Sequence, residues 1–334
     1  MTELSAWHAR HMESVLAADL PIVDAHHHMW HRPPERYQLD EILMDVSSGH
    51  NVRATVFVEC SAMYRTEGAE HLRPVGETEY VNGAAAASAS GIYGPVRLCA
   101  GISGFADLRR GAGVREVLEA HIRAGGDRFR GIRQQAQFDP VLGSLAKRPT
   151  QKGLLLDPRF QEGFAELAPL GLIYEVWVFF TQLDDVAALA VRFPETVIVL
   201  NHLGGPIAVG PYAGDKPANF RAWRAGMEKL AKLSNVRVKL GGLGMVAYGF
   251  DFHLRETPPD SETLATAWAP HVETCISLFG ADRCMFESNF PVDAQSCSYA
   301  ALWNAFKRLT RSAGPAERSA LFSATAARTY GLTI

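Results

Sequence analysis

Eight short runs of apolar residues recur along the chain, and most are rich in the β-branched and aromatic residues that favour strands. Most of the runs are flanked by Gly, Pro, Asn or Asp, which is typical of strands that end in turns. We therefore predict strands at residues 21–26, 52–60, 96–103, 129–134, 172–179, 196–202, 235–241 and 283–289.

Segments between these runs show the three- and four-residue spacing of apolar positions that indicates amphipathic helices. The clearest stripes lie in residues 220–233, 264–279 and 299–309. An Ala-rich segment at 84–89 also predicts a helix, which Gly91 is expected to end.

Strands that alternate with helices favour a parallel sheet, and eight of them favour a closed barrel. The main alternative is an open doubly wound sheet, which normally carries a glycine-rich phosphate turn after its first strand. Here the first run is followed by His26-His27-His28 instead. We therefore expect residues 1–334 to form one α/β domain, a (β/α)8 TIM barrel. Long loops are expected at 135–157, after the fourth strand and placed as a lid, and at 243–261, after the seventh.

Composition narrows the classes of partner. The 334 residues are 47% hydrophobic and 21% charged, as in soluble globular proteins, and the net charge is −3. No basic run and no stretch of about 18–20 apolar residues occurs, so neither nucleic acid nor a membrane is expected as a partner. The N-terminal segment lacks an apolar core of signal-peptide length, and the five scattered cysteines form no Cys-x-x-Cys pair, which fits a reducing cytoplasm.

The first run ends in a His-x-His pair, His26 and His28. Because side chains alternate along a strand, Asp24, His26 and His28 are expected to share one face, and His27 to point to the other. Two imidazoles at the end of a barrel strand are suited to binding a metal ion or polarising a carbonyl group.

Polar residues also lie toward the ends of the other apolar runs. In a barrel, the carboxyl ends of all strands lie on one face of the molecule. Each residue alone has an ordinary explanation as a solvated carboxylate or an ion-pair partner, but several buried charges in one layer favour a functional site. The candidates are Glu59, Arg130, Arg133, Glu175, Trp177, Asn201, His202, Lys239, Glu287 and Asn289. Histidines outside the runs are expected at the surface, namely His8, His11, His50, His71, His121 and His271.

Several segments together resemble the amidohydrolase superfamily, and within it the amidohydrolase-2 branch. They are Asp24–His28 followed by Trp30, then Arg130–Arg133, Asn201–Pro206, Lys239–Leu243 and Arg283–Pro291. The resemblance implies a distorted barrel with the active site at its C-terminal face. The branch includes lactonases, zinc- or manganese-dependent decarboxylases of aromatic acids, and C–C bond hydrolases acting on β-keto compounds.

Two positions depart from the pattern of the branch. Asn289 stands where members usually have an Asp that binds metal or acts as a base, and Asn cannot act as a general base. Glu175 and Trp177 stand where metal-dependent members generally have a histidine. Two alternatives remain open: one divalent ion, Zn2+ first among the candidates, or a metal-free site. The metal ligands would be His26, His28 and His202 with Glu175 or Glu59.

The leading hypothesis is hydrolysis of a small organic acid derivative, most simply a lactone. The three histidines would polarise the carbonyl, Arg133 would bind a substrate carboxylate, and Glu287, Glu59 or Glu175 would activate water, with Asn289 at the oxyanion or the water. Further substrate contacts are expected from Arg130, Trp177, Lys239 and Tyr248. The alternatives are C–C cleavage, by decarboxylation or retro-Claisen hydrolysis, and a degraded barrel that only binds a ligand. A homodimer is expected by analogy with other barrels.

Overall fold

A computed structural model describes residues 3–142 and 150–334 and contains an eight-stranded sheet in which all neighbouring strands are parallel. The strand order follows the sequence, which is the order of a (β/α)8 barrel and confirms the predicted fold class. The strands are β1 (Ile22–His27), β4 (Val52–Val58), β5 (Arg97–Gly104), β6 (Phe129–Arg133), β7 (Ile173–Val176), β8 (Ile198–Leu200), β9 (Val236–Leu240) and β10 (Cys284–Phe286). All eight predicted runs are confirmed as strands.

The first and last strands meet just beyond their carboxyl ends. The amide of Asn289 donates to the carbonyl of His26, and the amide of His28 donates to the carbonyl of Phe290, both at 2.8 Å. A parallel bridge joins His27 to Phe290. The ends of the sheet are therefore joined at the level of the His-x-His pair.

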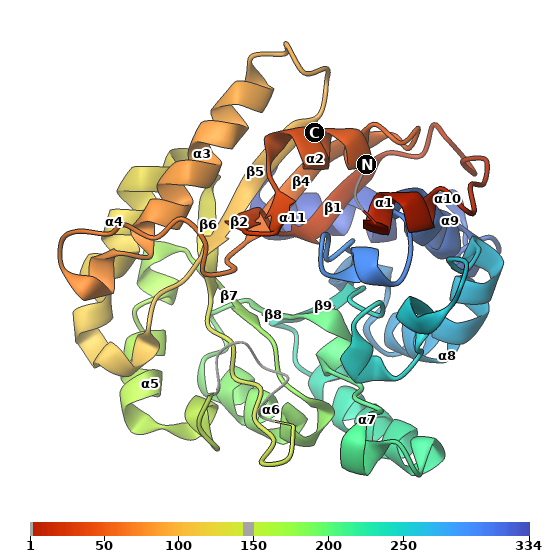
Figure 1. Ribbon diagram of the computed structural model, residues 1–334. Helices are drawn as coiled ribbons and strands as arrows, with labels where there is room; N and C mark the ends of the chain where they lie inside the picture. The colour runs from red at the N-terminus through yellow and green to blue at the C-terminus, as the bar shows by residue number, and fades with distance from the viewer. Residues whose placement is uncertain (1–2, 143–149) are drawn as a thin grey trace.

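Helices surround the sheet (Figure 1), and the three predicted apolar stripes and the Ala-rich segment lie in helices, apart from Lys232 and Leu233 at the end of the first stripe. The larger helices are α2 (Leu39–Val46), α3 (Val75–Ala89), α4 (Arg115–Gly125), α5 (Pro158–Phe164), α6 (Leu183–Arg192), α7 (Lys216–Ala231), α8 (Ser261–Phe279) and α9 (Tyr299–Leu309). Shorter ones are α1 (Glu3–His8), α10 (Pro315–Ser319) and α11 (Thr325–Tyr330). Asp215, Asp260 and Ser298 cap α7, α8 and α9 by accepting backbone N–H bonds, which fixes where these helices begin.

Apolar side chains form two clusters. The larger one lies between sheet and helices and includes the fully buried Trp223, Trp268 and Trp303. The smaller one contains Val23, Ala25 and residues of the facing strands. In the described part of the chain, no helix is long and apolar enough to cross a bilayer, and all five cysteines are free thiols.

A small antiparallel hairpin of β2 (Trp30–Arg32) and β3 (Glu35–Tyr37) follows β1 and was not predicted. The loop expected at 243–261 is confirmed, with only short 3-10 turns between β9 and α8. The predicted lid at 135–157 includes residues 143–149, which lie outside the described residues. The histidines expected at the surface include two that are buried, so that prediction is wrong for His50 and His121.

Candidate active site

A bulge at the end of β1 sets the direction of its side chains. The pairing of β1 with β4 shifts register between Asp24 and His27. Val23 and Ala25 pack with residues of the facing strands, whereas Asp24 accepts a hydrogen bond from Tyr299 Oη of the outer helix α9 at 3.1 Å. The expectation that Asp24 shares a face with His26 is therefore wrong, because the bulge inserts an extra residue between them. Burial raises the pKa of Asp24 to about 6.

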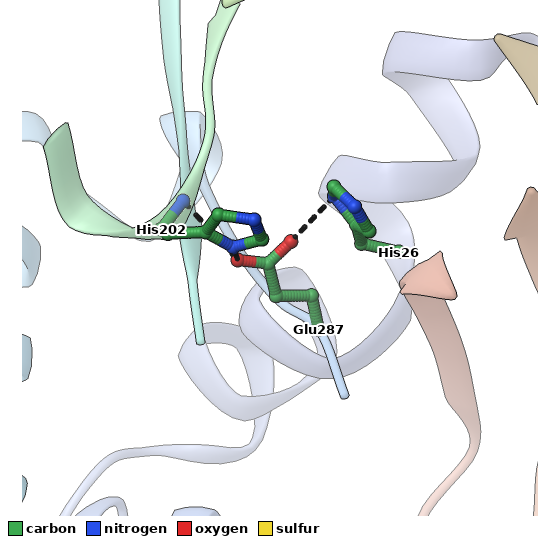
Figure 2. A group of neighbouring side chains, drawn as sticks. All are labelled: His26, His202 and Glu287. Carbon is green, nitrogen blue, oxygen red and sulfur yellow. Dashed lines mark hydrogen bonds and ion pairs between the residues drawn. The ribbon is translucent and has the colours of Figure 1, made fainter. Parts of the chain in front are cut away.

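Glu287, just after β10, lies between His26 and His202 (Figure 2). Its Oε1 is 2.7 Å from His202 Nδ1, and its Oε2 is 3.0 Å from His26 Nδ1. All three side chains are buried, with exposed fractions of 0–2%. The carboxylate accepts the Nδ1–H of His202 and so fixes the tautomer of that ring, whereas its Oε2 makes a close contact with His26 Nδ1 and no hydrogen bond.

His28 is oriented by the backbone instead. Its Nδ1 donates to the carbonyl of Val58 at 2.7 Å, and its Nε2 is 3.3 Å from His26 Nε2. Because Nδ1 of His28 is the donor to Val58, the Nε2 of His28 carries a lone pair, and this lone pair faces the Nε2 of His26. Burial is the main reason that the pKa values of His26 and His28 lie well below 6.5, so both rings are neutral.

Two glycines after β9 make room for this arrangement. A Cβ at Gly242 would lie 2.5 Å from His202 Nδ1, and a Cβ at Gly241 would lie 2.4 Å from Glu287 Cγ. Gly242 also has a positive φ of 72°, which other residues rarely adopt. The Gly241-Gly242 pair is thus required by the position of the His202–Glu287 pair.

Arg133 and Glu59 form a buried ion pair beside the histidines. Arg133 Nε donates to Glu59 Oε1 at 3.0 Å, and Arg133 Nη2 donates to the Glu59 carbonyl. Arg133 Nη1 lies 3.4 Å from His26 Nε2. The charge of Arg133 is therefore already balanced by a carboxylate, and its guanidinium is held in one orientation.

A second buried ion pair lies on the other side of His26. Lys239 Nζ is 2.5 Å from Glu175 Oε2 and 3.3 Å from His26 Nδ1. Glu175 also accepts hydrogen bonds from Asn201 Nδ2 and Tyr330 Oη, each at 2.8 Å. These three donors hold the Glu175 carboxylate in place, and Glu175 is not among the described residues whose ligand atoms come together at His26 and His202.

Asn289 is oriented by a residue that the sequence did not single out. Its Nδ2 donates to Asp293 Oδ1 at 2.7 Å, and Asp293 Oδ2 accepts the amide of Gly244 at 2.8 Å. The Oδ1 of Asn289 is buried without a hydrogen-bond partner. Burial raises the pKa of Asp293 to about 8.

A cavity of about 240 Å3 opens above these groups. Of the predicted site residues, those that line it are His28, Arg133, Trp177, His202 and Asn289. Those that lie beneath or beside the lining are His26, Glu59, Glu175, Lys239 and Glu287, all with exposed fractions of 0%. The predicted loop after β9 reaches the cavity through Met245, Val246 and Ala247.

Three predicted substrate contacts are not supported. Arg130 lies three residues before Arg133, so the alternation of side chains along β6 places the two arginines on opposite faces. Arg130 therefore shares the outward face with Ile132, where it donates to the carbonyl of Gly331 at 3.1 Å. Lys239 is buried beneath the histidines in its ion pair. Tyr248 is buried, and its hydroxyl donates to the carbonyl of His202 at 3.1 Å.

Several lining residues were missed by sequence reasoning. They are Arg32, Cys60, Ser61, Gln135, Val292 and Gln295. Only Arg32 could have been found from the sequence, because it continues the two-residue spacing that starts at His26 and His28. The others lie on irregular segments, whose side-chain directions a periodic pattern does not predict.

Comparisons with known proteins identify the family of this chain. A family model described as Amidohydrolase, of the amidohydrolase-2 type, matches residues 23–332. This chain belongs to the amidohydrolase-2 family. It is 32% identical over 337 residues to the uncharacterized protein y4mH of Sinorhizobium fredii, covering 94% of this chain and 99% of that protein.

Two further relatives carry information about chemistry. This amidohydrolase is 33% identical over 238 residues to L-fucono-1,5-lactonase of Burkholderia multivorans, covering 70% of this chain and 72% of the relative. It is also similar to a crystal structure of an amidohydrolase from Burkholderia multivorans with bound zinc. That similarity has 26% identity and a TM-score of 0.71, and it covers 93% of this chain and 99% of the other. The comparisons confirm an enzyme family.

The donor groups of this amidohydrolase fit one divalent ion. His26, His202 and Glu287 bring possible ligand atoms within 4.8 Å of one another. An alternative ligand set is the Nε2 atoms of His26, His28 and His202, in which case Glu287 and the Val58 carbonyl would contact the Nδ1 side of the rings. Arg133 Nη1 competes for the lone pair of His26 Nε2.

Proposed function

We propose that this amidohydrolase hydrolyses the ester bond of a small lactone. The observation that carries the proposal is the His202–Glu287 pair, in which a cavity-lining imidazole donates Nδ1–H at 2.7 Å to a carboxylate beneath it. This is the arrangement of a general base and its orienting acid. The lactonase relative supports the substrate class.

The mechanism follows from the directions of the donors and acceptors. His202 Nε2 takes a proton from a water molecule as its oxygen attacks the lactone carbonyl. Arg133, fixed by Glu59, donates to the oxyanion that develops, and Asn289 Oδ1 accepts the second proton of the water in a hydrogen bond. The tetrahedral intermediate then expels the ring oxygen, which receives the proton from His202. The product is a hydroxy acid.

In this scheme, Glu287 does not touch the substrate, which changes the role expected for it. It is fully buried, it does not line the cavity, and it acts through His202 and His26. A divalent ion held by the Nε2 atoms of His26, His28 and His202 would be the alternative to His202 as the base, because it would occupy the same nitrogen; it would supply Lewis-acid polarisation of the carbonyl and a bound water of lowered pKa.

The test is acid release from a panel of lactones, followed in a pH-stat, for the wild type and for the variants His202→Asn and Glu287→Gln. Each variant should lose about 10^2- to 10^4-fold in kcat, because each removes the base or its orientation. The control is His71→Asn, since His71 lies outside the cavity and pairs with Glu116. Release of CO2 from an aromatic acid, with no lactone opened, would contradict the proposal and favour decarboxylation.

A further inference from the structure

The wall of the cavity that begins at His28 continues outward through Trp30 and Arg32. These residues are two apart, so the alternation of an extended chain places all three on one side. His28 and Trp30 stack at 5.9 Å between ring centroids, and the Arg32 guanidinium lies 4.7 Å from the Trp30 ring. The β2–β3 hairpin thus brings a cation to the rim of the active site.

Positively charged side chains outnumber negatively charged ones around the cavity. Two arginines line it, and none of the described lining residues is Asp or Glu. Arg133 is balanced by Glu59 at 3.0 Å. Arg32 forms no ion pair with any carboxylate in the described part of the chain, and its partner across the hairpin, Glu35, is exposed. The excess positive charge at the cavity is therefore that of Arg32.

The guanidinium of Arg32 is held in place without being saturated. Arg32 Nη2 donates to the carbonyl of Cys60, which leaves four N–H donors of the five. The buried carboxyl of Glu77 accepts the amides of Cys60 and Ala62 through its Oε1, at 3.0 and 2.7 Å, and forms no ion pair with Arg32 among the described residues. A planar cation in this state is suited to two parallel hydrogen bonds with a carboxylate.

We propose that Arg32 binds a carboxylate of the substrate, so that the enzyme selects lactones that carry an acid group. This inference rests on the proposed lactonase function and names its substrate class. Trp30, Trp177 and Phe179 supply apolar walls for the ring, while His202 and Arg133 lie at the floor. The carboxylate that sequence reasoning assigned to Arg133 is thereby assigned to Arg32, which is half-buried and not ion-paired.

The test uses two matched probes, 5-carboxyphthalide and its uncharged 5-carboxamide, and measures binding by calorimetry whether or not turnover occurs. The wild type should bind the carboxylate about 10- to 100-fold more tightly than the amide. Arg32→Met should abolish this preference, and Arg32→Lys should keep part of it. The matched control is Arg36→Met, because Arg36 lies on the same hairpin, does not line the cavity and pairs with Asp40 and Glu41. The preference of the wild type should also weaken in high salt.

Equal affinity of the wild type for the two probes, no binding of the carboxylate, or a preference that survives in Arg32→Met would overturn the assignment. These outcomes are separate from failure of the lactonase proposal. An enzyme that opens neutral and acidic lactones equally well would contradict only the role of Arg32. Selective binding of the carboxylate probe by a protein that opens no lactone would contradict only the reaction.

Discussion

Lys239 is a fully buried cation whose charge is neutralised by Glu175 at 2.5 Å. Removing one partner of such a pair leaves the other charge buried and uncompensated. Lys239→Met should therefore lower the free energy of unfolding by about 3–5 kcal/mol, measured by urea denaturation. The double variant Lys239→Met/Glu175→Gln should recover most of that loss.

The control for this experiment is Lys229→Met, because Lys229 forms an exposed ion pair with Asp184 at 2.7 Å. Its loss should change the free energy of unfolding by about 1 kcal/mol or less. Equal effects of Lys229→Met and Lys239→Met would show that burial does not control the contribution of the Lys239 pair.

Asn289 is a second residue whose chemistry depends on one neighbour. Asn289→Asp places a carboxylate 2.7 Å from Asp293, a residue whose pKa burial already raises to about 8. The two acids should then share one proton, which is lost at high pH. The free energy of unfolding of the variant should therefore be about 2 kcal/mol lower at high pH than at mildly acidic pH. The swap Asn289→Asp/Asp293→Asn should restore the hydrogen bond with its direction reversed. A single variant as stable as wild type at every pH would show that the 289–293 contact is not made in solution.

At the scale of the secondary-structure elements, a buried histidine of α4 is in hydrogen-bond contact with α3. His121 is fully buried, with its Nδ1 2.8 Å from Thr78 Oγ1 and its Nε2 donating to the carbonyl of Phe105 at 2.9 Å. Burial lowers the pKa of His121 from 6.5 to about 4. A histidine of lowered pKa stabilises the fold fully above about pH 6.5, and this contribution is lost as pH falls toward 4.

We therefore expect His121→Gln to reduce the acid sensitivity of the protein. The pKa shift corresponds to about 3 kcal/mol of unfolding free energy between neutral pH and pH 4, which the variant should no longer lose. The measurement is the melting temperature as a function of pH, with His71→Gln as the control on an exposed contact. Parallel curves for wild type and His121→Gln would contradict the pKa shift.

The strands were predictable because a buried parallel strand needs a continuous apolar run, and each run contains most of one observed strand. Side-chain directions were predictable only while the period of two held. They were right for His26 and His28 but wrong for Asp24, because the bulge in β1 reverses the register without an apolar signal. Arg130 was misplaced because it was grouped with Arg133, which lies on the opposite face of β6.

The partners of the charged residues were not predictable either. Glu287, Glu59 and Glu175 are equivalent in the sequence, yet one contacts two histidines, one pairs with Arg133 and one pairs with Lys239. These differences arise from contacts between strands that are far apart in the chain.

At the scale of the whole molecule, the candidate metal ligands come from strands that are far apart in the chain. His26 lies near the end of β1, His28 follows that strand and His202 follows β8, so an ion bound by all three would tie two sides of the barrel together. Protein purified without a chelator should contain about one zinc per chain, and removal of zinc should lower the melting temperature, because a ligand that binds only the folded state stabilises it. Elemental mass spectrometry with thermal melts provides the measurement. A fully active protein without metal, with an unchanged melting temperature after chelation, would leave the reaction to His202 and Arg133.

The backbone contacts that join the two ends of the sheet, His26 to Asn289 and His28 to Phe290, involve the residues of the active site itself. A cut in the connection between Gly205 and Lys216 would leave His26, Arg133 and His202 on one fragment and Glu287 and Asn289 on the other. Neither fragment would hold a complete set of reacting groups. Hydrolysis would therefore appear only when the fragments reassociate, which makes this barrel suited to use as a split reporter whose signal requires both halves.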